Sequence, residues 1–335
     1  MVQEGLQNRP TRVLLVGAGR MGLGHLKELL KVPQLATVVG GVDPSPEARQ
    51  RLQAEYGISL TFADLKPALA SMQCDAAIIS VPNFLHAEYA LTALGAGLHV
   101  FIEKPMALTL ADVDTMVRTA ERQGRLLMAG QTLRFVGPLR YVKRLIDAGA
   151  IGTVRHVLHR RMGAGRGGGE RSWFARQEQS GGILPGIGVH SLDILLWWLG
   201  ERAISVYAVV QNIDPHPDVD IEDEASLVAT SQSGAVINAA FSFHHEAGTD
   251  WIAAGSDGVI TLNGNSGPLL LNGEVQDVPD IVELPGERQI QREFLAAIRD
   301  HRPLAQAAGA EVRHVMALIF AAQESGRTGQ SVVVP

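Results

Sequence analysis

Residues 12–22 read RVLLVGAGRMG, an apolar β-forming run followed at once by three glycines in the spacing G-x-G-x-x-G. In such a turn the first glycine, Gly17, allows a tight bend, and the second, Gly19, lets the backbone approach a pyrophosphate. The third, Gly22, lets the following helix pack closely on the strand. The phosphates would lie on the helix N-terminus, because its free N–H groups and dipole favour an anion. The stretch therefore predicts a strand, a dinucleotide-binding turn and a helix.

An acidic residue follows at the end of the next predicted strand. Asp43 closes TVVGGVD, about twenty residues past the last glycine, where a carboxylate can accept hydrogen bonds from the adenosine ribose hydroxyls. That carboxylate would repel a 2'-phosphate, so NAD is favoured over NADP, although the nearby Arg49 leaves NADP open. The alternative for Asp43 is that it only caps the next helix. Arg20 and Met21, inside the turn, are further candidate cofactor contacts.

Short β-rich runs and helical patterns alternate over the first part of the chain. The β-rich runs cover residues 12–17, 37–43, 74–82, 98–105 and 125–130, and the helical patterns cover 20–31, 45–56, 84–96 and 110–122. Strict alternation of this kind predicts a parallel sheet with helices on both faces. The first part of the chain is therefore expected to form a doubly wound Rossmann domain.

The pattern changes after about residue 130. Helical stretches at 138–148 and 187–199 are followed by β-rich runs at 203–211, 224–232, 235–245 and 257–264, by helical patterns at 286–299 and 311–325, and by a final SVVVP. Strands that are neighbours in sequence favour antiparallel pairing. We expect an α/β protein with a dinucleotide-binding domain over residues 1–129 and an α+β substrate-binding and oligomerisation domain, with a largely antiparallel open sheet, over residues 130–335.

Composition narrows the class of partner. The 335 residues are 46% hydrophobic with a net charge of -6 and no block of like charges, which argues against nucleic acid or an anionic membrane as the main target. A small-molecule substrate is expected instead. The single cysteine, Cys74, cannot form an internal disulfide and is expected in the core. The first ten residues are polar and no later run reads as a charge-free membrane span, so we expect a cytoplasmic protein.

Three further stretches carry a resemblance to a known family. They are VPNFLHAEYALTALGAGLHVFIEKP at 81–105, GQTLRFVGPLRYVKRLIDAGAIGTV at 130–154 and GGILPGIGVHSLD at 181–193. Together with the glycine turn, they resemble the Gfo/Idh/MocA family of NAD(P)-dependent oxidoreductases over nearly the whole chain. The resemblance implies hydride transfer between nicotinamide and a sugar, a cyclitol or a related polyol or ketone.

The tripeptide Glu103-Lys104-Pro105 resembles the family's E-K-P signature, at the carboxyl end of a predicted parallel strand. The resemblance implies that Lys104 stabilises negative charge on the substrate oxygen as hydride leaves or arrives. The alternative is a surface lysine that ends a strand. Pro105 permits a cis peptide bond.

The resemblance also implies cofactor contacts from Glu103 and from Pro82, Asn83 and His86, which match the loop near the nicotinamide ribose. Arg134 matches the family's R-F pair and is a candidate substrate contact, although Thr132 replaces the asparagine usually found two positions earlier.

The candidate proton-transfer residue is His190. In the family its segment usually reads D-x-G-x-H, whereas this chain has Gly186 four residues before His190. The resemblance implies that His190 acts as general base or acid; the alternative is a hydrogen-bonded core histidine. Asp193 is a candidate partner for it or a structural acid, and the acids of residues 218–226 are another source of a carboxylate. Gly186 could leave room for a bulkier substrate. No metal site is expected, because His190 and Asp193 supply at most two ligands.

A segment rich in glycine and arginine precedes His190. Residues 163–188 contain nine glycines, and residues 160–176 contain five arginines: Arg160, Arg161, Arg166, Arg171 and Arg176. This composition predicts a mobile loop that closes over the substrate, and arginine forks suit a carboxylate or phosphate. The alternative is a solvated loop with surface arginines. Trp173 could stack on a sugar ring or anchor the loop.

Two other functions stay open at this point. Loss of the aspartate at position 186 is compatible with a non-catalytic protein that senses a dinucleotide or a sugar, and the family also contains NAD-dependent glycoside hydrolases. The resemblance implies a homodimer or homotetramer, since an antiparallel sheet with one uncovered face commonly drives assembly in this family.

Overall fold

The computed structural model of the chain describes residues 9–163, 172–244, 248–279 and 286–335. The chain forms two compact units, Met1–Gly130 with Glu287–Glu311, and Gln131–Gly286 with Val312–Pro335. The boundary at 129/130 expected from the sequence differs from these units in one respect, because a late segment returns to the first unit. Ala129 N donates a hydrogen bond to Ala307 O at 3.0 Å, which ties this late segment to the last strand of the first sheet.

The first unit contains a six-stranded parallel sheet in the order β3-β2-β1-β4-β5-β6, which confirms the doubly wound Rossmann prediction. Its strands are β1 Thr11–Val16, β2 Ala36–Val42, β3 Thr61–Phe62, β4 Ala76–Ile79, β5 His99–Ile102 and β6 Leu127–Ala129. Its helices are α1 Arg20–Leu29, α2 Pro46–Tyr56, α3 Leu65–Ser71, α4 His86–Gly95, α5 Leu110–Gln123 and α9 Gly286–Arg299, with a 3-10 turn η1 at Asn83–Leu85. The short β3 and α3 were not expected from the sequence.

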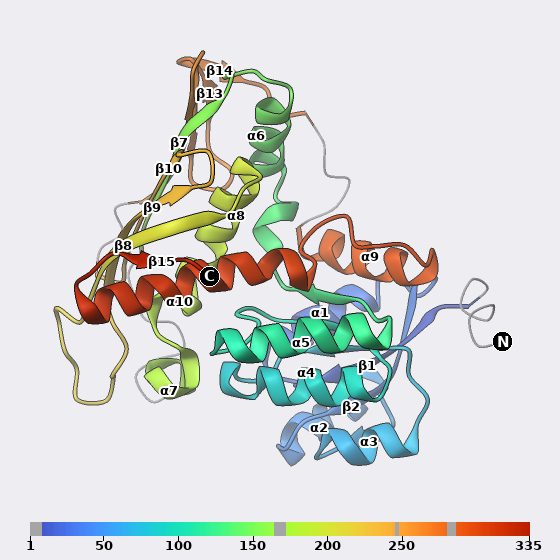
Figure 1. Ribbon diagram of the computed structural model, residues 1–335. Helices are drawn as coiled ribbons and strands as arrows, with labels where there is room; N and C mark the ends of the chain where they lie inside the picture. Colours follow the sequence, from blue (N-terminus) through green and yellow to red (C-terminus); the bar gives the residue numbers. More distant parts are fainter. Residues whose placement is uncertain (1–8, 164–171, 245–247, 280–285) are drawn as a thin grey trace. The chain divides into compact units, whose positions relative to one another are not determined.

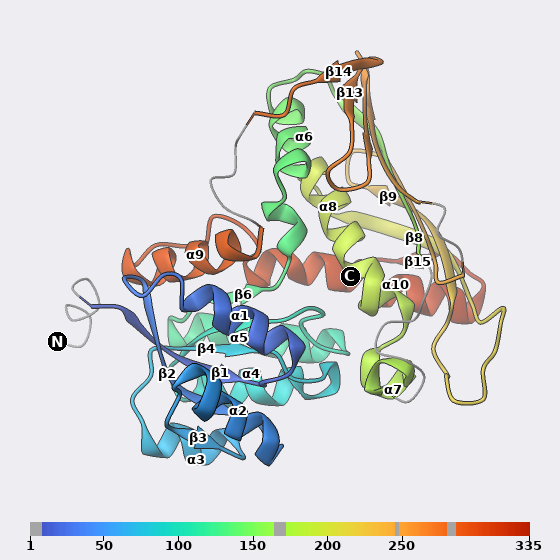
Figure 2. The ribbon, with the colours of Figure 1, turned by 180° about the vertical axis from the view of Figure 1, so that it is seen from behind.

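Central strands of this sheet are apolar along their whole length. All four residues of β4 are fully buried, as are Val100, Phe101 and Ile102 in β5. A strand with both faces covered needs apolar side chains at every position. Figure 1 shows α4 and α5 over one face of the sheet, and Figure 2 shows α1 over the other.

The second unit contains a nine-stranded sheet in the order β14-β13-β12-β11-β7-β10-β9-β8-β15. Strands β7 and β10 are parallel and the other described pairs are antiparallel, which confirms the largely antiparallel prediction. The strands are β7 Val154–Met162, β8 Ala203–Gln211, β9 Glu224–Ser231, β10 Val236–Ser242, β11 Gly248–Gly255, β12 Val259–Asn263, β13 Leu269–Leu271, β14 Glu274–Gln276 and β15 Val332–Val333. The helices are α6 Gly137–Asp147, α7 Gln177–Ser180, α8 Val189–Leu199 and α10 Gly309–Thr328, with a π-helix η4 at Leu184–Gly188 and 3-10 turns η2 at Thr132–Phe135 and η3 at Trp173–Ala175.

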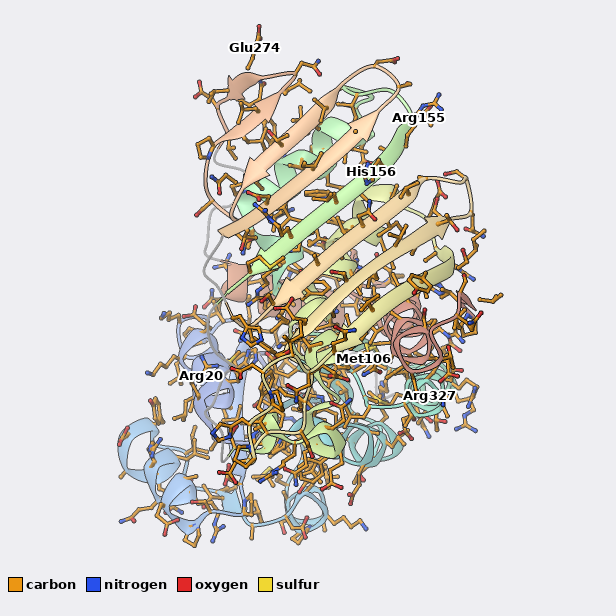
Figure 3. The ribbon with its side chains drawn as sticks, turned by 90° about the vertical axis from the view of Figure 1, so that its left-hand side faces the viewer. Arg20, Met106, Arg155, His156, Glu274 and Arg327 are labelled. Carbon is orange, nitrogen blue, oxygen red and sulfur yellow. The ribbon has the colours of Figure 1, made fainter. Side chains whose placement is uncertain are left out.

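One face of this second sheet is packed and the other is not. Burial alternates along β8 and β9, as expected for a sheet with one solvated face. Tyr207 and Val228, on the uncovered face, are 48% and 50% exposed. Figure 3 looks onto this outer face, with Arg155 and His156 of β7 labelled and the helices behind the strands. A hollow of about 930 Å³ lies along it.

One apolar helical stretch and the single cysteine bear on the expected location of the protein. The stretch Gln177–Leu199 is long and apolar enough to cross a membrane, but 78% of its apolar window is buried inside the protein, as in a core helix. Cys74 is half-buried rather than in the core as expected, because it sits just outside β4. Burial raises the pKa of its thiol to about 11.

Candidate active site

The glycine turn after β1 has the geometry that the sequence predicts. Gly17 has a φ of +91°, and a Cβ there would lie 2.5 Å from Ser80 O. A Cβ on Gly22 would lie 1.9 Å from Gly17 O, so this glycine permits the close packing of α1 on the turn. A Cβ on Gly19 would meet nothing within 4 Å, and no side chain caps α1 at this residue. The backbone is therefore open beside Gly19, and no side chain caps the first N–H groups of α1, which fits a pyrophosphate.

Asp43 holds the end of β2 to this turn. Its Oδ2 accepts a hydrogen bond from Ala18 N at 2.8 Å, and its Oδ1 accepts one from Ser45 N at 2.9 Å. Ser45, rather than Asp43, is the N-cap of α2, so the alternative in which Asp43 only caps that helix is wrong. Arg49 Nη1 donates to the carbonyl oxygens of Asp43 and Pro44 at 2.8 Å each, which engages the cation that could have favoured NADP.

Arg20 and Met21 form the start of α1. Arg20 is exposed and Met21 is half-buried, so both remain candidate cofactor contacts, and Figure 3 labels the Arg20 side chain.

Glu103, at the end of β5, is joined to a buried hydrogen-bond chain. Gln291 Nε2 donates to His25 Nδ1 at 2.7 Å, so the His25 proton lies on Nε2, which donates to Glu103 Oε1 at 2.8 Å. The other carboxylate oxygen, Oε2, accepts from Lys104 N at 3.2 Å. Only 6% of Glu103 is exposed. The chain therefore holds the carboxylate directly beside the backbone of the candidate catalytic lysine.

Glu103 is an anion in this setting. Burial raises its pKa, but the hydrogen bond from His25, together with the charge and backbone N–H of Lys104, outweighs burial and holds the pKa below its usual value. Both oxygens of Glu103 accept hydrogen bonds inside the protein, and its cofactor contact stays a prediction. Sequence reasoning missed His25 and Gln291. A signal for His25 existed, since it lies with Gly22, Leu26 and Leu29 on the buried face of α1.

His86 ties the loop after β4 to the loop after β5. Its Nδ1 lies 2.6 Å from Pro105 O and its Nε2 lies 2.9 Å from Val81 O, and the residue is fully buried. Burial lowers the pKa of His86, although the two carbonyl oxygens act in the opposite direction. The expected cofactor contact from His86 is not supported, since neither ring nitrogen is exposed to a ligand. The Lys104–Pro105 peptide bond is cis.

Pro82 and Asn83 begin the turn η1 next to His86. Pro82 is half-buried and Asn83 is 5% exposed. Their cofactor contacts stay predictions.

In the second unit, the space beside Gly186 is filled. A Cβ on Gly186 would lie 2.8 Å from Phe174 Cζ, so the phenyl ring occupies the space that a side chain at position 186 would need. The expectation that Gly186 leaves room for a bulkier substrate is therefore wrong. Trp173 meets the same ring edge-on, with centroids 5.8 Å apart, which supports its reading as a packing residue. His190 follows, half-buried, in the first turn of α8.

Arg134, predicted to contact the substrate, and Asp193, predicted as a partner of His190 or a structural acid, bind each other. Arg134 Nε donates to Asp193 Oδ2 at 2.7 Å, and Nη2 donates to Oδ1 at 2.6 Å. Their side chains are 1% and 0% exposed. The guanidinium also lies 5.8 Å from the ring centroid of Trp197. A buried bidentate pair of this kind fixes α8 to the turn η2, so the expected substrate contact from Arg134 is not supported and the structural role of Asp193 is favoured.

Among the acids of residues 218–226, Glu222 and Asp223 have specific partners. Glu222 Oε2 accepts from Ile183 N at 3.1 Å, just before the π-helix that leads to His190. Asp223 is fully buried, accepts from Ile213 N and Asp214 N at 2.7 and 2.8 Å, and pairs with His244 at 3.0 Å. Glu222 is thus a positioning residue that sequence reasoning did not single out.

The expected mobile loop lies partly outside the described residues, since Arg166 and Arg171 fall in 164–171. The part that follows, from residue 172, forms the short helical turns η3, α7 and η4 rather than a loop. Across residues 9–163, 172–244, 248–279 and 286–335, no three His, Cys, Asp or Glu side chains are grouped to hold a metal ion.

Comparison with known proteins identifies the relatives of this chain. It is 37% identical over 198 residues to the putative UDP-kanosamine synthase oxidoreductase subunit of Amycolatopsis mediterranei, an alignment that covers 58% of this chain and 53% of that protein, so the chain matches about half the length of this relative. It is 29% identical over 307 residues to the 4-carboxy-2-hydroxymuconate-6-semialdehyde dehydrogenase of a Sphingobium species, covering 87% of this chain and 91% of that one.

The fold has solved counterparts. The WlbA dehydrogenase of Bordetella pertussis, crystallised with NADH and UDP-GlcNAcA, superposes with a TM-score of 0.88 at 24% identity, over 98% of this chain and 99% of that one. Residues 11–131 match the model of the oxidoreductase family with an NAD-binding Rossmann fold, and residues 139–261 match the GFO/IDH/MocA C-terminal domain. The chain therefore belongs to the Gfo/Idh/MocA family of oxidoreductases, and its first unit is an NAD-binding Rossmann domain.

Proposed function

We propose that this protein is an NAD-dependent dehydrogenase or reductase that acts on a CH–OH group of a sugar, cyclitol or related polyol, or on the corresponding ketone. One observation carries the proposal. The glycine turn follows β1 and Lys104 follows β5, and only β4 separates these two parallel strands. The carboxyl ends of parallel strands meet at one edge of the sheet, where such folds bind ligands.

The proposed reaction uses NAD and the side chains of Lys104 and His190. Oxidation of the alcohol removes a hydride from its carbon and a proton from its oxygen. NAD supplies the hydride acceptor, and NADH the donor in the reverse direction. The Lys104 ammonium stabilises the negative charge that develops on the substrate oxygen. The His190 imidazole accepts the hydroxyl proton, or returns it when a carbonyl is reduced.

The substrate class is supported by the names of the relatives. One is a subunit of a synthase for a nucleotide sugar, one is a dehydrogenase of a carboxylated semialdehyde, and the WlbA crystal holds a nucleotide sugar. All of these are oxygen-rich small molecules, which agrees with a polyol-type substrate for this chain.

The test compares the wild type with Lys104→Met and His190→Gln. Cofactor binding is measured as the NAD-induced rise in melting temperature, and turnover as NADH formation across a panel of polyols and sugars. Lys104→Met should lose about 100- to 1,000-fold in kcat, and His190→Gln about 100-fold or more, while both keep the NAD-induced stabilisation.

Other outcomes separate the rival functions. NAD binding without turnover of any polyol or ketone would favour the dinucleotide- or sugar-sensing protein. Cleavage of a glycoside without net NADH would identify a hydrolase that uses NAD only transiently. Unchanged turnover in Lys104→Met would contradict the proposed mechanism.

We further propose that a second copy of the chain covers the outer face of the nine-stranded sheet, giving a homodimer or homotetramer. Half-exposed Tyr207, Val209 and Val228 on that face support this assembly. Light scattering should show a mass that falls when Val228 is changed to Glu. A cytoplasmic location is also proposed, supported by the single cysteine, and is tested by fractionating cells that make the protein.

A further inference from the structure

Arg161 is a half-buried cation on the inner face of the nine-stranded sheet. Along β7, the buried residues Val157 and His159 point to this inner face, and Arg161 is the next residue in the same row. Its neighbour Arg160 points to the outer face and pairs with Asp250. In the part of the chain that the structure describes, no hydrogen bond or ion pair joins the Arg161 guanidinium to another residue.

The surroundings of Arg161 connect it with the segment that carries His190. Arg161 is in register with Phe241 of β10. The Phe241 ring lies 3.3 Å from the position of a Cβ on Gly188, two residues before His190. Helix α8, which begins with this segment, packs on β7 and β10. Arg161 thus lies on the face of the sheet that supports the candidate proton-transfer residue.

A half-buried guanidinium needs an anionic partner to offset the cost of its desolvation. Taking a guanidinium partly out of water disfavours its charged form, and burial lowers the pKa of Arg161 accordingly. Folded proteins normally offset this cost with a carboxylate. Arginine keeps its charge and offers a planar fork of donors, which matches a carboxylate or a phosphate in two hydrogen bonds.

We propose that Arg161 binds an anionic group of the substrate, a carboxylate or a phosphate, and so makes this enzyme select an acidic sugar or polyol over its neutral counterpart. The inference rests on the proposed function, because it assigns a specificity residue to the same reaction. The sequence offered five arginines for this role. Arg161 lies on the inner face, and among the residues that the structure describes it has no hydrogen-bond or ion-pair partner.

The test uses three probes that differ in one group: D-glucose, D-glucuronate and D-glucose 6-phosphate. Each is added to the NAD-loaded protein, and the rise in melting temperature and the NADH formed are measured. The variants are Arg161→Met, Arg161→Lys and, as a matched control on the opposite face, Arg160→Met. The tryptophan fluorescence of each variant, which reports on the second unit, shows that this unit is folded.

At least one anionic probe should stabilise the wild type more than glucose does, and the probe that does so tells carboxylate from phosphate. Arg161→Met should weaken binding of this anionic probe at least about tenfold, which corresponds to the loss of roughly one charge-assisted hydrogen bond. Arg161→Lys should keep part of the binding, and Arg160→Met should leave the binding unchanged. Equal binding of the anion by Arg161→Met, or no preference for either anion over glucose, would overturn the inference. NAD-linked oxidation of neutral polyols without that preference would leave the proposed function standing, whereas absence of NAD-linked turnover on any substrate would overturn the proposed function itself.

Discussion

The carboxyl edge of the six-stranded sheet depends on backbone geometry, whereas the segment around His190 depends on side-chain partners. At the sheet edge, Gly17 and Gly22 act through backbone geometry, and their sequence spacing predicts that geometry. Around His190, the neighbours Arg134 and Asp193 are bound to each other instead of facing a substrate. A motif that depends on the backbone can therefore be interpreted from sequence, whereas one that depends on side-chain partners needs the three-dimensional neighbours.

The largest effect is expected when the buried ion pair is broken. Arg134→Met leaves the Asp193 carboxylate buried and uncompensated, which should cost about 3–5 kcal/mol of stability. All four tryptophans lie in the second unit, so tryptophan fluorescence during denaturation reports on this unit. The double variant Arg134→Met/Asp193→Leu should recover much of the loss. Normal stability with a raised KM in Arg134→Met would instead indicate that Arg134 contacts the substrate.

The second prediction concerns the filled space at position 186. Gly186→Asp pushes a side chain into the Phe174 ring and should cost about 1–3 kcal/mol, again followed by tryptophan fluorescence. Phe174→Leu in the same chain should relieve most of this cost. The double variant then carries a carboxylate one helical turn before His190, and its kcat/KM should shift in pH dependence relative to Phe174→Leu alone. If Gly186→Asp were as stable as the wild type, Phe174 would not be what excludes the aspartate.

A third prediction concerns the carboxyl edge of the six-stranded sheet, where Gln291, His25 and Glu103 are joined by hydrogen bonds. Gln291→Leu removes the donor to His25 Nδ1, so the proton of His25 can leave Nε2 and release Glu103. Loss of one such hydrogen bond is worth about 1 kcal/mol, and kcat should fall by up to about tenfold. Gln291→Glu instead favours a doubly protonated His25 and should change the pH profile of kcat. Unchanged kcat and pH profile in both variants, with normal NAD affinity, would show that the chain Gln291, His25, Glu103 does not position Lys104.

The fourth prediction separates the acid sensitivity of the two units. Burial, with the charge of Arg125, lowers the pKa of His99 in the first unit to about 4, and burial lowers that of His159 in the second to about 3. A lowered histidine pKa means that the folded state prefers the neutral ring. This stability is complete above the ordinary pKa of 6.5 and is lost as pH falls from there toward the folded value.

Between pH 7 and pH 5, His99 should account for about 1–2 kcal/mol of lost stability. His99→Gln should reduce the pH dependence of unfolding when unfolding is followed by circular dichroism. The pH dependence followed by tryptophan fluorescence, which reports on the second unit, should not change. An unaltered slope by circular dichroism would contradict the assignment.

Much of the first unit could be predicted from sequence because its signals are local. The alternation of strands and helices, the turn at Gly17 to Gly22, Asp43 and the position of Lys104 after a strand all depend on residues close together in the chain. The segments missed were short or lacked a clear pattern, as in β3 with two residues and in β7, whose RHVLHRRM does not alternate cleanly. The π-helix before His190 also has no local signature beyond its glycines.

The sequence by itself determined the fold class, the family and the geometry of the glycine turn, since steric limits on the backbone and the two periods of hydrophobic patterning act over a few residues. Only the tertiary structure decided that Arg134 meets Asp193 across 59 residues, His25 meets Glu103 across 78, and Gln291 meets His25 across 266. Such pairs form because burying a polar group requires a partner, and packing chooses that partner from distant segments that no local pattern connects.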